Sequence, residues 1–293
     1  MMAVSPEHWQ EVGWDGVTFQ LPAAWQATAL RNSYLFFEQD GQPAFEMKWE
    51  QTRGRFAPER ILNKLRDALQ ASGTVVSSWN IPPELQDLVQ EYSITGFQCQ
   101  HDQLASLGFL LFCPSCGRTT MFRFYGTYSQ DTHVLQTVLQ TFSDHTEKED
   151  KVWAMYDIRA VLPAQAGLKS HEFMAGRYTL SFEYYGSTIT LYRFKPAAAL
   201  LNSKGLEAFG SSLAEHAICV DRTDGSTATW EYTASGLDRF AVLLGRKPAW
   251  IWLRLRHIRA KNVILGVKGS GKRDMDRELM EHIAANFTAT DTY

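Results

Sequence analysis

The chain has 293 residues, of which 45% are hydrophobic and 13% aromatic, and this suffices for one large or two average domains with their own cores. Its four cysteines are too few for a disulfide framework, and no apolar run approaches the roughly 20 residues that a membrane span requires. With a net charge of −3 and no apolar targeting segment among its first residues, it is expected to be a reduced, cytoplasmic protein without a membrane partner.

The first half of the chain alternates short strand patterns with two helical patterns. Apolar residues at every second position predict strands at residues 44–49, 88–94, 107–112 and 119–125. Apolar residues three and four apart predict helices at 57–71 and 132–142. Sequential strands joined by short turns form an antiparallel meander, so we predict one sheet with helices packed on it, an α+β fold.

Four candidate zinc ligands lie in this half: Cys99, His101, Cys113 and Cys116. The sequence from Cys113 to Gly117, Cys-Pro-Ser-Cys-Gly, resembles half of a zinc knuckle, because proline and glycine shape a turn around two thiolates. A redox role fits less well, since a thioredoxin-like CxxC opens a helix and this one joins strands.

The expected hairpin argues against all four ligands sharing one ion. If residues 98–102 pair with 107–113, His101 lies near the turn and Cys113 at the far end, roughly 15 to 20 Å away. Ligands of one zinc ion lie about 4 Å apart. The alternative to a four-ligand zinc site is that the CxxC is a reduced turn between two strands.

A tandem duplication accounts for the second half. Residues 143–151, SDHTEKEDK, include no apolar residue, and we predict a linker at 147–152 between domains at 1–146 and 153–293. Beyond it, FEYYGSTITLYRF from Phe182 matches FEQDGQPAFEMKW from Phe37 without a gap. In the same alignment Arg256 and Arg259 replace Cys113 and Cys116, so the second copy is expected to fold without a metal.

Residues 246–273 contain nine Lys or Arg and no Asp or Glu. A strand at 250–256 would place Trp250, Trp252, Arg254 and Arg256 on one face, and indoles beside guanidiniums suit stacking on bases or pairing with phosphates and carboxylates. We therefore predict a partner-binding surface made of these four residues with Lys272 and Arg273. The alternative is that the tryptophans pack under a helix at 206–216 or against the other copy, with the arginines reaching solvent.

The same stretch contains a partial phosphate-loop pattern, from Gly266 to Lys272. Its last position holds Arg273 instead of Ser or Thr, and no parallel βαβ pattern surrounds it, so we predict a glycine-rich turn and no nucleotide hydrolysis. The sequence contains no nucleophile elbow, no HExxH motif and no pair of carboxylates at a spacing typical of a catalytic site. A convergence of His216, His257 and Glu183 in one cleft would be the sign of an enzyme.

Each copy opens with an apolar strand that ends at Leu21-Pro22 or Leu162-Pro163, followed by a meander through Phe-Glu and an aromatic-rich strand before the first helix. This order resembles the PsbP-like superfamily, which includes photosystem accessory subunits, a Ran-binding nuclear transport factor and DcrB-type bacterial proteins. The resemblance implies binding or accessory domains rather than enzymes. It carries over no functional residue, because the shared Leu-Pro is a turn.

These patterns favour a non-enzymatic binding or accessory protein that needs no cofactor and binds an anionic protein or nucleic acid through its second copy. Two hypotheses compete with it. One is a zinc-binding module in the first copy, and the other is an enzyme with a site between the domains.

Overall fold

The computed structural model describes residues 8–290, except 103, 127–130, 146–149, 203–204, 224, 237 and 273–274. Contacts divide the described residues into two compact units. The first is built mainly from residues up to 145, together with 154–156, and the second from residues 150–153 and from 157 onward. Among the described residues, no helix is long and apolar enough to cross a membrane.

The first unit contains a seven-stranded antiparallel sheet and a hairpin of β1 (Trp9–Trp14) and β2 (Val17–Pro22). In spatial order the sheet consists of β3 (Gln26–Arg31), β4 (Tyr34–Gln39), β5 (Gln42–Gln51), β9 (Arg118–Tyr125), β8 (Leu104–Phe112), β7 (Ser93–His101) and β6 (Val75–Trp79). The helices are α1 (Pro58–Gln70), α2 (Pro83–Gln86), the 3₁₀ turn η1 (Asp87–Val89) and α3 (Thr132–Thr141).

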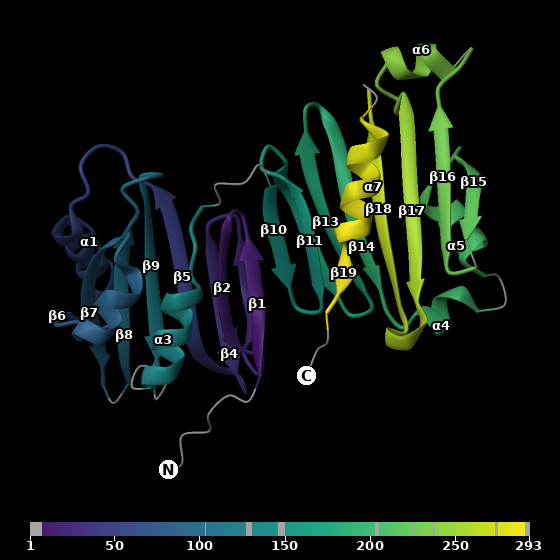
Figure 1. Cartoon of the computed structure of the whole chain (residues 1–293). Helices are drawn as coiled ribbons and strands as arrows, with labels where there is room; N and C mark the ends of the chain where they lie inside the picture. The colour runs from purple at the N-terminus through teal and green to yellow at the C-terminus, as the bar shows by residue number, and fades with distance from the viewer. Residues whose placement is uncertain are drawn as a thin grey trace. The chain divides into compact units, whose positions relative to one another are not determined.

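Side chains alternate between the two faces of this sheet, and each face has its own cover. On one face, α1 buries Leu62 against Phe97 and Leu110. On the other, Phe45 of β5 packs on Phe124 of β9 with ring centroids 4.9 Å apart, and α3 packs against β2 (Figure 1). The face that carries Phe45 and Phe124 is buried, whereas the α1 face is covered only in part, because Lys48 and Glu50 of β5 are exposed on it.

The second unit repeats the strand order of that sheet. In space it runs β12 (Gly167–Met174), β13 (Arg177–Tyr184), β14 (Ser187–Phe194), β18 (Val263–Gly271), β17 (Trp250–Ile258), β16 (Thr227–Thr233) and β15 (Ile218–Thr223). The other elements are β10 (Asp150–Met155), β11 (Ile158–Pro163), α4 (Ala197–Leu201), α5 (Gly205–Leu213), α6 (Asp238–Leu243), η3 (Arg259–Lys261), α7 (Arg277–Asn286) and β19 (Thr288–Ala289). Helix α7 lies along β18 (Figure 1).

The predicted fold class is confirmed: the sheets are antiparallel and carry packed helices. The strand predicted at 88–94 is wrong in most of its length, because residues 87–89 form η1 and β7 begins at Ser93. Val89, one of the apolar residues of the pattern, is buried by the 3₁₀ turn and not by strand pairing.

The glycine-rich turn predicted from Gly266 onward is also wrong, since Gly266 and Gly269 lie within strand β18. A Cβ on Gly269 would come within 2.6 Å of the Trp250 ring and 2.9 Å of the Met280 side chain. Glycine is required here because large side chains cross the strand closely, and not because the chain turns.

Candidate metal centre

The CxxC segment forms the turn between β8 and β9. Phe112 and Thr119 are the last paired residues, so the turn spans residues 113–118. The amide of Gly117 donates to the carbonyl of Cys113 at 2.9 Å, and Gly117 has φ +72°, a conformation that favours glycine. The side chain of Gln51, at the end of β5, donates to the carbonyl of Cys116 at 2.7 Å. The two thiols are thereby held on a turn that is fastened to the neighbouring strand.

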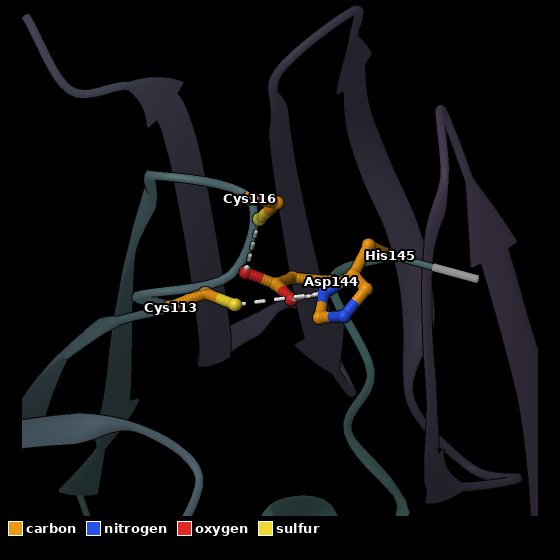
Figure 2. A group of neighbouring side chains, drawn as sticks. All are labelled: Cys113, Cys116, Asp144 and His145. Carbon is orange, nitrogen blue, oxygen red and sulfur yellow. Dashed lines mark hydrogen bonds and ion pairs between the residues drawn. The ribbon is translucent and has the colours of Figure 1, made fainter. Parts of the chain in front are cut away.

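The segment that follows α3 approaches this turn. Ser143 forms an antiparallel bridge with Thr18 of β2, with both N···O distances 2.8 Å. The hydroxyl of Ser143 donates to the carbonyl of His145 at 2.6 Å, and the guanidinium of Arg118 donates to the carbonyl of Asp144. These bonds fix the backbone of Asp144 and His145 so that both side chains point toward the cysteines (Figure 2).

Four ligand-type atoms meet here, one each from Cys113, Cys116, Asp144 and His145, and all lie within 4.8 Å of one another. The Sγ of Cys113 is 3.6 Å from Nδ1 of His145, and the Sγ of Cys116 is 3.5 Å from Oδ2 of Asp144 (Figure 2). Nδ1 of His145 is also 2.6 Å from Oδ1 of Asp144. This group can hold a metal ion.

Two of the four side chains are buried, and Cys116 and His145 are half-buried. The side chain of Asp144 is 1% exposed, and Cys113 is 2% exposed. Burial raises the pKa of the Cys116 thiol to about 11, so without a cation the thiol stays protonated at neutral pH. A bound divalent cation would reverse this preference, because a coordinated thiol is deprotonated.

A hydrogen bond from a neighbouring phenol holds the carboxylate of Asp144 in place. The hydroxyl of Tyr92 donates to Oδ1 of Asp144 at 3.2 Å, which leaves Oδ2 facing Cys116. Burial, followed by the negative charge of Asp144, raises the pKa of Tyr92, so the phenol keeps the proton that it donates. Hydrogen bonds of this kind orient the ligands of metal sites in proteins.

The structure brings together only two of the four ligands predicted from the sequence. Cys99 lies on β7 opposite Ser106 and belongs to the buried cluster beneath α1. His101 ends the same strand, and its partly exposed ring lies 3.7 Å from the Asp102 carboxylate. The hairpin thus separates His101 from Cys113, as the sequence argument anticipated.

Asp144 and His145 were not identified as ligands from the sequence, because they lie in the polar segment 143–151, which we interpreted only as marking the boundary between the domains. One local feature of the sequence could have identified them. An Asp-His pair begins three residues after the end of α3, where a chain leaving a packed helix still lies close to the sheet.

No equivalent site is present among the described residues of the second unit. Its corresponding turn, between Ile258 and Val263, has four residues instead of six and contains η3. The register corrects the sequence alignment: Arg259 follows the last paired residue, as Cys113 does, whereas Arg256 lies inside β17 opposite Leu265. The two additional residues of the first turn make room for the second cysteine and Gly117.

The structure does not present the predicted partner-binding residues as one surface. Trp250 and Trp252 are 5% and 4% exposed, and their face of β17 lies beneath α7 instead of the helix at 206–216. Arg254 stacks 5.4 Å from the Trp252 ring and pairs with Glu281, and Arg256 donates to the carbonyl of Phe287. Both arginines thus fasten the C-terminal helix.

Of the two remaining predicted residues, Lys272 is exposed just after β18, and Arg273 lies outside the described residues. The histidines proposed for an enzyme do not converge. His216 follows α5 and lines a cavity with Ile251 of β17, whereas His257 lies six residues further along that strand, roughly 20 Å away.

Comparisons with known proteins add no functional information. No protein-family model matches the chain, and no curated protein matches it. A crystal structure from Bacteroides thetaiotaomicron VPI-5482 is 10% identical over 52% of this chain and 53% of that chain, with a TM-score of 0.31. The crystal structure of MucB in complex with MucA(peri) is 8% identical over 94% of this chain and 82% of that chain, with a TM-score of 0.19. This chain therefore covers only about half the length of the first of these structures.

Proposed function

We propose that the first unit is a zinc-binding module in which Cys113, Cys116, Asp144 and His145 hold one Zn²⁺. The observation that carries the proposal is the spacing of the ligand atoms. With bonds of about 2.3 Å to sulfur and 2.1 Å to nitrogen or oxygen, tetrahedral geometry separates two zinc ligands by about 3.6 Å. The sulfur–nitrogen and sulfur–oxygen distances here are 3.6 and 3.5 Å.

The donor types favour zinc over other common ions. Two thiolates and an imidazole suit Zn²⁺, whereas Ca²⁺ and Mg²⁺ take oxygen ligands almost exclusively. Two thiolates and one carboxylate would leave the occupied site with one net negative charge, next to the guanidinium of Arg118. Asp144 and His145 would supply the two ligands that a four-coordinate site needs in addition to the two thiolates.

The role that follows is structural. Four protein ligands close the coordination sphere of zinc and leave no position for a substrate or a reactive water. The ion would join the β8–β9 turn to the segment after α3, two parts of the first unit that are far apart in sequence. This role fits the hypothesis of a non-enzymatic binding or accessory protein, which we retain as the broader proposal.

Metal analysis of the purified, untagged protein tests the assignment. We expect about one zinc per chain, lost in the Cys113→Ser/Cys116→Ser variant and in His145→Gln. Cys219→Ser and His101→Gln are the matched controls, since Cys219 lies in the second unit and His101 at the far end of β7.

Two outcomes would contradict the proposal. One is metal-free protein that stays so when zinc is supplied in excess during refolding. The other is zinc that survives His145→Gln but is lost in His101→Gln, which would restore the ligand set predicted from the sequence.

A further inference from the structure

The first unit also contains a cavity that is lined by basic side chains. A cavity of about 520 Å³ opens between the end of β5, the loop that follows it and the first turns of α1. Thr52, Thr119 and Ile61 are among its lining residues. Its volume falls within the range of about 300–1,000 Å³ that is typical of small-molecule sites.

Four basic side chains line this cavity: Arg53, Arg55, Arg60 and Lys64. The first two flank Gly54 in the loop after β5. The other two are four residues apart on α1 and therefore share one face of the helix. Glu50 is the one carboxylate among the residues that line the cavity, so the lining has an excess of three positive charges.

None of these four cations has an ion-pair partner among the residues that the structure describes. Some exposed arginines elsewhere do have partners, such as Arg177, which pairs with Glu172 at 2.6 Å, and Arg222, which pairs with Glu207 at 2.5 Å. Like charges four residues apart on a helix destabilise it, as do cations gathered around one hollow. An anion in the cavity would relieve this repulsion.

Hydrogen-bond donors other than the cations are also present. The hydroxyls of Thr52 and Thr119 bond to each other across the strands. Each hydroxyl carries one proton, and their mutual bond uses only one, so the pair can still donate to another acceptor. Guanidiniums with additional hydroxyl donors match the many acceptor oxygens of a phosphate chain.

We propose that this cavity binds a small molecule that carries two or more phosphate groups. Several guanidiniums can contact adjacent phosphates in pairs, and an excess of three positive charges suits a diphosphate or triphosphate better than a single carboxylate. The inference is independent of the zinc site, because none of the four metal ligands lines the cavity.

Calorimetric titration of the full chain with inorganic tripolyphosphate tests the proposal, with acetate as the monovalent comparison. We expect tripolyphosphate to bind with an affinity that falls as salt increases, and acetate to produce no signal. Arg53→Gln and Arg60→Gln should each weaken tripolyphosphate binding about tenfold, as expected for the loss of a charge-assisted hydrogen-bonding group. The matched control is Lys169→Gln/Arg239→Gln, which removes two exposed charges from the second unit.

Three results would overturn the proposal. The first is no binding of tripolyphosphate at low salt. The second is equal weakening by the cavity variants and by the control, which would reflect the charge of the whole chain. The third is binding of a single-stranded oligonucleotide, with the same dependence on Arg53 and Arg60, that is much tighter than tripolyphosphate binding. That result would identify the cavity as part of a nucleic-acid surface.

Discussion

The two units share one strand order, but their turns between equivalent central strands differ. In the first unit, six residues from Cys113 to Arg118 separate the paired strands, and the turn meets Asp144 and His145. In the second, four residues suffice, and Asn262 supplies the left-handed conformation with φ +53°. This sheet can therefore close with a turn of four residues, and the longer turn of the first unit has room for Cys116 and Gly117.

The second unit instead contains a buried ion pair. Arg193 on β14 donates to the carboxylate of Asp157, and their side chains are 7% and 4% exposed. The guanidinium also lies 4.4 Å from the centre of the Tyr178 ring. We infer that each unit joins distant segments with its own polar cluster, a metal-type cluster in the first and an ion pair in the second.

The largest expected effect comes from removing the proposed zinc ion. A strong chelator, or the Cys113→Ser/Cys116→Ser variant, should destabilise the first unit by several kcal/mol, since structural zinc sites contribute on the order of 10 kcal/mol. Hydrogen exchange read by mass spectrometry should show lost protection in residues 113–118 and 143–145 and unchanged protection in residues 259–262. If chelation changes the exchange of neither turn, or of both turns equally, the proposed difference between the two units is wrong.

Breaking the ion pair of the second unit should cost less. Asp157→Asn leaves Arg193 as a buried, unpaired charge, and such losses cost about 3–5 kcal/mol. Urea denaturation followed by circular dichroism measures the change. Glu172→Gln is the control, because it breaks an exposed ion pair that is worth about 0–1 kcal/mol.

The stability of the first unit should also depend on pH through Cys116. In metal-free protein, burial raises the pKa of Cys116 to about 11 from 9.0, so the folded state holds this proton more tightly than the unfolded state. The resulting stabilisation is present below pH 9.0 and is lost as the pH rises toward about 11. Thermal melts across this range should show a larger loss in metal-free protein than in Cys116→Ser, in which Cys99, whose pKa is also raised by burial, still contributes.

With zinc present, stability should rise with pH instead of falling, because metal binding requires the thiolate and releases its proton. Zinc affinity should therefore rise with pH in the range where the metal-free protein loses stability. Melts that decline equally with and without zinc would argue against Cys116 as a ligand.

The smallest expected effect concerns the turn itself. Gly117→Ala should cost about 1 kcal/mol, because alanine is strained at positive φ. Gly117→Asn should cost less, since asparagine tolerates this conformation and already occupies it at Asn262 in the second unit. Equal losses for the two variants, measured by urea denaturation, would point instead to the contact with the Gln51 side chain.

The sequence by itself predicted the elements whose patterns are local. The apolar stripe of Ile61, Leu62, Leu65 and Leu69 predicted α1, and the alternation of 119–125 predicted β9. The Cys113–Cys116 pair was identifiable because both thiols lie on one turn. The PsbP-like resemblance stays a prediction.

Only the tertiary structure decided which residues complete each cluster. Asp144 and His145 are 28 or more residues beyond Cys116, and their approach depends on α3 packing against β2 and on the bridge from Ser143 to Thr18. Similarly, the alternation of 250–256 specified two faces of a strand but not that α7 covers one of them. Periodicity reports the local backbone geometry, whereas contacts between distant segments arise from the packing of the whole unit, which no short sequence window contains.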